Sequence, residues 1–223
     1  GQIRFVHDGG ELAPSYVVTV SDGADTDGPV AATINFTNVN DAPTVSVPGS
    51  VFINEIHYDD TGVDEGEAIE IAGVAGIDLN GWSLVMYNGF NGFVYDTVNL
   101  SGTLPNQADN FGTLAFSFPT NGIQNATSGN PDGVALVDPT GNVVQFLSYE
   151  GAFEANDGPA NGLTSTDIGV SEDGDTTAEG KSLQLTGSGA TFTWAPSPED
   201  ESFGTINSGQ DFAAIAAATN QRI

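Results

Sequence analysis

Apolar and polar residues alternate in short stretches from residue 51 onward, with Gly, Asn, Asp or Pro between most of the stretches. In the first stretch, Glu55 and His57 fall on the face opposite the apolar one. Period-two alternation at this spacing predicts an all-β sandwich with a largely aromatic and aliphatic core. The apolar positions expected to share a strand face are Phe52, Ile56 and Tyr58; Ile69 and Ile71; Trp82, Leu84 and Met86; Leu114, Phe116 and Phe118; Val134 and Leu136; Val144 and Phe146; Leu183 and Leu185; and Phe192 and Trp194.

A separate β pattern occupies the first 44 residues. Strands are predicted over residues 3–6, 16–20 and 32–36, with an acidic, turn-rich loop over residues 21–28. Three strands bury little core, so we expect this part to be the end of a larger module. The expected division is residues 1–44 as that end piece, 45–50 as a linker, 51–212 as the sandwich, and 213–223 as a tail or linker.

The charge balance narrows the possible partners. The chain carries 30 Asp and Glu but only 3 Lys and Arg, for a formal net charge of -27. Binding of nucleic acid by a basic face is excluded because phosphate neutralisation needs Lys or Arg. Divalent cations are the natural partners of so acidic a surface. The alternative is that the charge serves solubility in salty water.

Little in the sequence supports catalysis. The chain has 0 Cys and 2 His, and His7 and His57 lie in different predicted modules, so a zinc site would lack ligands. No Gly-x-Ser-x-Gly elbow occurs. We expect His57 to be an outward-facing strand residue and the chain to have no enzymatic role. No stretch approaches the roughly 20 apolar residues of a membrane span, so we expect no membrane insertion.

The densest group of carboxylates falls between two predicted strands, in residues 59–67, where five acidic residues occupy nine positions. Ca²⁺ takes six to eight oxygen ligands from flexible loops, and this loop supplies carboxylates and carbonyls. The Gly positions do not fit the EF-hand pattern. The predicted ligands are Asp59, Asp60, Asp64 and Glu67. The alternative is a loop whose carboxylates all face water.

A second acidic stretch, residues 167–175, lies in the longest irregular segment of the sequence, residues 150–180. Glu172 is a candidate to complete a calcium site with the first group. The alternative is a mobile loop, since irregular segments of this length are commonly mobile or functional.

Another candidate for binding is the stretch of residues 87–95, YNGFNGFVY. Asn-Gly pairs favour a hairpin turn, which would place Phe90 at its tip. An exposed aromatic side chain there could stack on a cell-surface glycan or dock a protein partner.

Two family resemblances accompany these patterns. The body resembles a lamin-tail domain, an immunoglobulin-like sandwich, in residues 51–58 (VFINEIHY), 67–71 (EAIEI), 78–84 (DLNGWSL), 130–138 (NPDGVALVD) and 146–151 (FLSYEG). The first part resembles the end of a cadherin-like or chondroitin-sulfate-proteoglycan-type repeat in residues 5–9 (FVHDG), 14–23 (PSYVVTVSDG) and 38–43 (NVNDAP).

The resemblances imply a function and a location. In cadherin-like arrays an Asn-Asp pair at the module junction binds Ca²⁺, which here implies Asn40 and Asp41 as ligands. The lamin-tail resemblance implies a piece of a large secreted or surface protein of bacteria. We therefore expect a non-catalytic, calcium-dependent adhesion, binding or spacer module. The alternatives are an accessory domain of an extracellular endonuclease/exonuclease/phosphatase-type nuclease whose catalytic domain lies outside this chain, and an independent carboxylate-based hydrolase.

Overall fold

The computed structural model describes residues 17–31, 51–125, 130–188 and 192–213. The chain divides into two compact units, Gly1–Thr44 and Val45–Ile223. The named secondary-structure elements of the described residues are all β-strands, which confirms the predicted all-β class. No helix among them has the length and apolar character needed to cross a membrane.

In the first unit, strands β1 (Val17–Ser21) and β2 (Thr26–Ala31) form an antiparallel hairpin. The side chain of Asp22 closes the turn, because its Oδ1 accepts hydrogen bonds from the backbone N–H groups of Ala24 at 3.0 Å and Asp25 at 2.9 Å. The second strand therefore begins inside the stretch predicted as loop. The other two predicted strands of this unit, and Asn40 and Asp41, lie outside the described residues.

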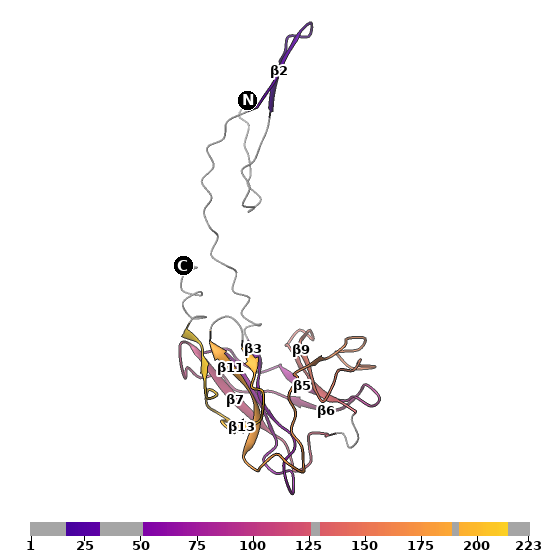
Figure 1. Cartoon of the computed structure of the whole chain (residues 1–223), viewed down its shortest axis with the longest axis vertical. Helices are drawn as coiled ribbons and strands as arrows, with labels where there is room; N and C mark the ends of the chain where they lie inside the picture. The colour runs from indigo at the N-terminus through magenta and orange to yellow at the C-terminus, as the bar shows by residue number, and fades with distance from the viewer. Residues whose placement is uncertain (1–16, 32–50, 126–129, 189–191, 214–223) are drawn as a thin grey trace. The chain divides into compact units, whose positions relative to one another are not determined.

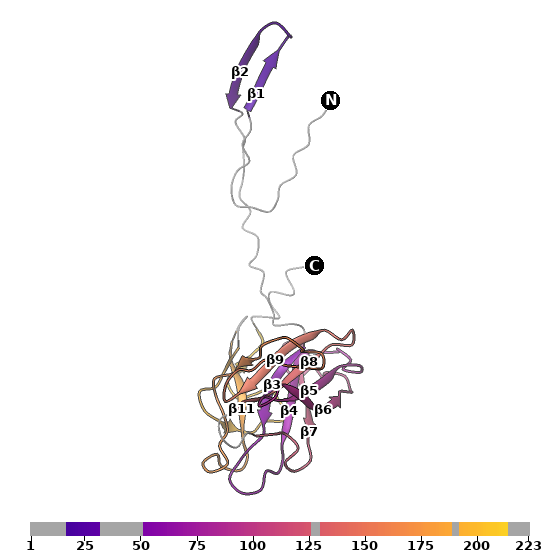
Figure 2. The same cartoon turned by 90° about the vertical axis from the view of Figure 1, so that its right-hand side faces the viewer.

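The second unit contains two sheets (Figure 1). The five-stranded sheet has the order β10-β9-β8-β5-β6 and faces the viewer in Figure 2. Its strands are antiparallel except for the short parallel pair of β10 with β9. The strands are β5 (Ser83–Asn88), β6 (Phe93–Asn99), β8 (Asp132–Val137), β9 (Val143–Tyr149) and β10 (Thr166–Asp167).

The other sheet has the order β12-β11-β3-β4-β7, and β13 and β14 also pair with β11. The strands β3 and β4 are central to it, and the acidic loop predicted at residues 59–67 connects them. The strands are β3 (Val51–His57), β4 (Ala68–Val74), β7 (Phe111–Ser117), β11 (Lys181–Ser188), β12 (Thr193–Trp194), β13 (Glu199–Asp200) and β14 (Gln210–Asp211).

The main core lies between the two sheets and confirms most of the predicted apolar faces. Ile56 and Ile69 from one sheet pack in one cluster with Leu84 and Val134 from the other. Burying such side chains is the dominant favourable term in folding. Each sheet also buries side chains on its outer face, where irregular segments cover Tyr87 and Phe52.

Three of the predicted faces are wrong. Leu183 packs in the main core, whereas Leu185 packs with Phe52 in the outer-face cluster. The other two exchanges lie in β3 and β9, where a β-bulge shifts the alternation. In β3, Ile53 pairs with Ile71 and Glu55 with Glu70, which leaves Asn54 as an extra residue. Phe52 therefore lies on the outer face, away from Ile56. A bulge inserts one residue, so side chains before and after it exchange faces.

The second exchange is in β9, where Gln145 pairs with Leu136 and Val143 with Val137. Val144 therefore packs in the main core, whereas Phe146 packs on the outer face of its sheet. Phe146 was predicted to share the face of Val144.

Candidate functional site

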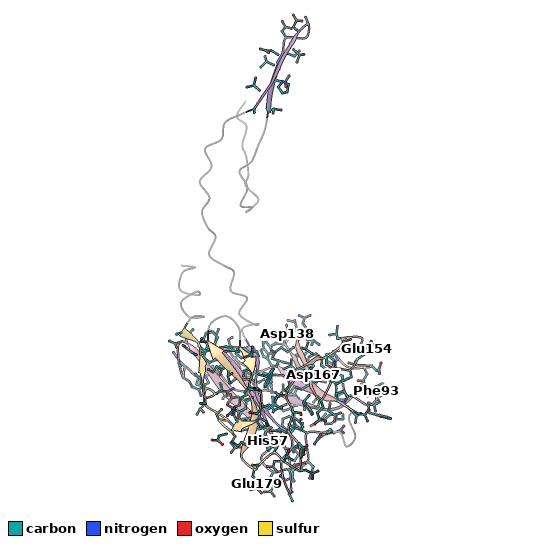
Figure 3. The ribbon with its side chains drawn as sticks, viewed as in Figure 1. His57, Phe93, Asp138, Glu154, Asp167 and Glu179 are labelled. Carbon is teal, nitrogen blue, oxygen red and sulfur yellow. The ribbon has the colours of Figure 1, made fainter. Side chains whose placement is uncertain are left out.

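The connection between β3 and β4 begins with two buried carboxylates. Asp59 is 6% exposed and Asp60 is 4% exposed, although both lie in the loop just beyond the end of β3. Buried carboxylates are costly unless they are paired or hydrogen-bonded. What surrounds these two side chains therefore decides what the loop can do. Figure 3 shows His57, at the end of β3, on the same side of the body as Glu179.

Glu172 fixes the start of this loop from a segment far along the chain. Its Oε2 accepts hydrogen bonds from the backbone N–H of Tyr58 at 2.6 Å and of Asp59 at 2.9 Å. Its Oε1 lies 3.1 Å from Nδ1 of His57. Tyr58 returns the contact, because its hydroxyl accepts a hydrogen bond from the backbone N–H of Glu172 at 2.8 Å. Both carboxylate oxygens of Glu172 are thus engaged within the protein.

His57 is the cationic member of the cluster. Burial lowers its pKa, but the hydrogen bond and charge of Glu172, with smaller contributions from Glu65 and Asp60, raise it to about 9. Its Nε2 lies 3.4 Å from the carbonyl oxygen of Glu65 and 3.8 Å from Oδ2 of Asp60. At neutral pH His57 is therefore protonated and compensates part of the negative charge. The prediction that His57 faces outward is wrong, because its side chain is buried and only 1% exposed.

Asp59 and Asp64 share one small volume. Burial, followed by the hydrogen bond and charge of Asp64, raises the pKa of Asp59 to about 7. The side-chain amide of Asn125 donates a hydrogen bond to Oδ2 of Asp59. On the other side, a Cβ built on Gly174 would lie 2.8 Å from Oδ1 of Asp59, so a side chain there would displace this carboxylate. Two carboxylates this close do not both ionise unless a cation lies between them. Without a cation, they share a proton.

Asp60 has a buried carboxylate oxygen, Oδ1, without a hydrogen-bond partner among the residues that the structure describes. Its backbone N–H lies 3.4 Å from Oδ1 of Asp64, a long contact. Burial raises its pKa, His57 opposes this, and Glu179 adds to it. An unpaired buried carboxylate oxygen costs on the order of 1–3 kcal/mol or more, so it marks a position where a partner would stabilise the protein.

Four of the predicted ligands lie close together in the structure: Asp59, Asp60, Asp64 and Glu172. The carboxylate of Glu67 is instead hydrogen-bonded to backbone N–H groups. Glu67 is fully buried, and its carboxylate accepts the backbone N–H groups of Gly122 at 2.6 Å and Ile123 at 3.2 Å. Glu67 therefore fastens a neighbouring turn to β4. Within the described ranges, no group of three or more His, Cys, Asp or Glu side chains is already arranged to hold a metal ion.

Comparisons with known proteins add no relative to this picture. No family model, no curated protein and no solved structure matches the chain. The resemblances to a lamin-tail domain and to a cadherin-like repeat therefore stay predictions that depend on their quoted residues.

A second pair of carboxylates, which the sequence analysis did not single out, lies on the outer face of the β3–β4 sheet. Glu55 and Glu70 are direct cross-strand partners and are fully buried. Oε1 of Glu55 accepts hydrogen bonds from Oγ of Ser182 at 2.5 Å, Nε2 of Gln184 at 3.2 Å and N of Ser202 at 2.8 Å. Oε2 accepts one from Oγ of Ser202 at 3.0 Å. Burial raises the pKa of Glu55, and the bonds from Ser182 and Ser202 limit the rise.

Glu70 is held in the same way. Its Oε1 accepts a hydrogen bond from Nδ2 of Asn54 at 2.9 Å, and its Oε2 accepts one from the backbone N–H of Gly204 at 2.6 Å. Burial raises its pKa to about 7 despite these bonds, and the charge of Glu55 contributes to the rise. Together the two glutamates fasten the segment between β13 and β14 onto the sheet.

Proposed function

We propose that the chain is a non-catalytic, calcium-dependent binding or spacer module of an extracellular protein, and that the β3–β4 loop is its calcium site. The observation that carries this proposal is the buried Oδ1 of Asp60, which has no hydrogen-bond partner among the described residues and lies beside the Asp59–Asp64 pair.

Electrostatics favours a cation in this loop. Two like charges about 4 Å apart repel by about 4 kcal/mol at an effective dielectric constant of 20. Protonated His57 reaches Asp60 only at 3.8 Å and is hydrogen-bonded mainly to Glu172. Asp59, Asp60 and Asp64 are therefore under-compensated, and a divalent cation would relieve their repulsion.

The donor set is the kind that Ca²⁺ takes. The carboxylates of Asp59, Asp60 and Asp64 and the carbonyls of the loop are hard oxygen ligands. The side chain of Asn125 lies beside them, hydrogen-bonded to Asp59. Asp64 is only partly buried and Gly62 is exposed, so this part of the loop has room to adjust around an ion. Glu172 supports the ligands by holding the backbone of Tyr58 and Asp59.

The affinity should be low. His57 is a positive charge next to Asp60 and opposes a cation there, and the ligands are not arranged in advance. Open sites of this kind bind Ca²⁺ with dissociation constants on the order of 10⁻⁴ to 10⁻³ M, which suits extracellular calcium concentrations.

The environment of the charged groups supports a non-catalytic role. His57 and Glu172 are each 1% exposed, and their polar atoms are bonded to each other and to the backbone of the loop. A general base must reach the proton that it abstracts. This pair instead stabilises the loop that would carry the ion.

Thermal unfolding with and without calcium tests the proposal. For a dissociation constant of about 1 mM, about 10 mM Ca²⁺ should stabilise the protein by about 1.4 kcal/mol, or about 3–6 °C in Tm. Asp60→Asn should abolish this gain, because it removes the charge beside the Asp59–Asp64 pair. Glu199→Gln, which removes an exposed carboxylate on β13, is the matched control and should retain it.

Two results would contradict the proposal. One is a Tm of the unaltered chain that does not respond to Ca²⁺ in this range. The other is an equal gain in Asp60→Asn and in the Glu199→Gln control, which would assign the effect to the overall negative charge.

A further inference from the structure

The hairpin of β5 and β6 exposes two aromatic side chains at its tip. Phe90 is 76% exposed and Phe93 is 48% exposed, whereas most other aromatic side chains of the body are buried or half-buried. The hairpin and the position of Phe90 at its tip confirm the prediction from the Asn-Gly pairs. Aromatic side chains presented in this way contribute little to the fold and are typical of binding surfaces.

The backbone of the tip is held in one conformation by its own side chains. Oδ1 of Asn88 accepts a hydrogen bond from the N–H of Phe90 at 3.1 Å, and Oδ1 of Asn91 accepts one from the N–H of Phe93 at 2.9 Å. The N–H of Gly92 donates to the carbonyl of Asn88 at 2.7 Å. The two phenyl rings are therefore attached to a fixed turn.

Neighbouring segments fix the tip from beneath. The N–H of Gly89 donates to Oδ1 of Asp132 at 2.9 Å, and a Cβ on Gly89 would lie 1.7 Å from the carbonyl oxygen of Pro131. A Cβ on Gly92 would lie 2.4 Å from the carbonyl oxygen of Glu154. The tip thus contacts these backbones at the two positions where only glycine fits, while Phe90 is largely exposed and Phe93 is about half exposed.

The surroundings of the two rings are acidic. Glu154 is exposed and its backbone touches Gly92, and Asp157 is half-buried and accepts a hydrogen bond from the N–H of Val94 at 2.8 Å. Figure 3 shows Phe93 and Glu154 at one end of the body and His57 away from them. Among the described residues, Lys181 on β11, in the other sheet, is the single Lys or Arg. The charge around the tip therefore favours a cationic partner.

The polar groups of the tip argue against a sugar. Nδ2 of Asn88 donates to Oε1 of Gln124 at 2.6 Å, and Nδ2 of Asn156 donates to the carbonyl of Asn91 at 2.7 Å. Each of these two amide groups already donates one hydrogen bond within the protein, which leaves fewer donors for the hydroxyls of a sugar. A phenyl ring beside a carboxylate instead suits a guanidinium or ammonium group, which is attracted to both.

We propose that the tip of the β5–β6 hairpin docks a basic segment of a partner protein, with an Arg or Lys side chain over Phe90 or Phe93 and its charge facing Glu154. The residues of this surface are separate from those of the proposed calcium site. The docking therefore does not depend on the ion, and it should persist when Ca²⁺ is removed with EDTA.

Selection from a displayed library of random peptides against the whole chain tests this inference. Enriched peptides should carry Arg or Lys next to apolar residues. Titration with one such synthetic peptide should show at least about tenfold weaker binding for the double variant Phe90→Ser, Phe93→Ser, and weaker binding for Glu154→Lys. Added NaCl should also weaken binding by screening. Because both rings are exposed, the double variant should keep the Tm of the unaltered chain.

Val30→Ser is the matched control, because Val30 is a similarly exposed apolar residue in the other unit, at 65%. It should bind the peptide like the unaltered chain, which separates docking at the tip from general attraction to an acidic protein. Enriched peptides without cationic residues, or equal binding by the double variant, would overturn the inference. So would failure to enrich any peptide, or binding of a neutral oligosaccharide that the double variant abolishes.

Discussion

The strands β3 and β4 carry two groups of buried carboxylates that are stabilised in different ways. Glu55 and Glu70, in the middle of the strands, accept hydrogen bonds from Ser182, Ser202 and Gly204 among others. Asp59 and Asp60, just beyond the end of β3, have fewer donors, and one oxygen of Asp60 has no partner in the described part of the chain.

The difference shows how a chain with 30 acidic residues and 3 Lys and Arg can bury carboxylates. Where hydroxyl, amide and backbone N–H donors surround the carboxylates, as at Glu55 and Glu70, no metal ion is needed, although burial still raises the pKa of Glu70 to about 7. Where donors are few, the charge must be balanced by a proton or a cation. The first arrangement stabilises the fold, whereas the second leaves a position that responds to ions.

The largest expected effect in this comparison is that of Glu55→Ala. The change leaves Oγ of Ser182, Nε2 of Gln184 and the N–H of Ser202 without their acceptor. We expect a loss of about 3–5 kcal/mol in the free energy of unfolding, measured with urea. Glu199→Ala, on the exposed surface of β13, is the control and should change little.

Calcium should not restore the stability lost in Glu55→Ala, because Glu55 lies in the middle of β3 and not in the β3–β4 loop that is proposed to bind the ion. An unfolding midpoint close to that of the unaltered chain would show that the donors find water or other acceptors, and the distinction between the two groups would then be lost.

The sequence predicts which face of a strand a side chain occupies only where no bulge interrupts the alternation. Alternation correctly placed Ile69, Ile71, Leu84 and Met86 in the core, because each of these pairs is uninterrupted along its strand. It failed for Phe52, because the bulge at Asn54 is set by pairing with β4 and leaves no periodic signal.

The candidate site was predictable only as far as it is local. The density of acidic residues between two strands identified Asp59, Asp60 and Asp64. It could not identify the bond between His57 and Glu172, which lie 115 residues apart, or the contact of Asn125 with Asp59. These contacts follow from the packing of loops against the end of β3, which is a tertiary property.

A smaller effect is the dependence of stability on pH through Glu70. Its pKa is raised to about 7 in the folded protein from an ordinary value of about 4.5, so the folded state prefers the protonated form. The stabilisation is complete below about pH 4.5 and is lost as the pH rises towards 7, by at most about 3 kcal/mol. Glu70→Gln should remove this part of the slope in urea unfolding measured from pH 4.5 to 7.

His57 contributes in a different pH range. Because its folded pKa is raised to about 9, its stabilisation is complete below about pH 6.5 and is lost as the pH rises through 9. Glu70→Gln should leave the slope above about pH 8 unchanged, because Glu70 is ionised there in the folded protein. An identical slope in the unaltered chain and the variant between pH 4.5 and 7 would contradict the role assigned to Glu70.

The smallest expected effect concerns Glu67, which was predicted as a calcium ligand and whose carboxylate accepts the backbone N–H groups of Gly122 and Ile123. In Glu67→Gln, one of these two contacts loses its acceptor. We expect a loss of about 1 kcal/mol in the free energy of unfolding. The gain in Tm with Ca²⁺ should stay as in the unaltered chain, in contrast to Asp60→Asn.

This pair of variants separates a carboxylate that binds the ion from one that holds the protein around it. If Glu67→Gln lost the calcium response while keeping its stability, Glu67 would be a ligand that leaves the backbone of Gly122 when the ion binds. The site would then extend from Asp64 to Glu67, the residue before β4, and the division between donor-satisfied and ion-requiring carboxylates would fall between Glu67 and Glu70.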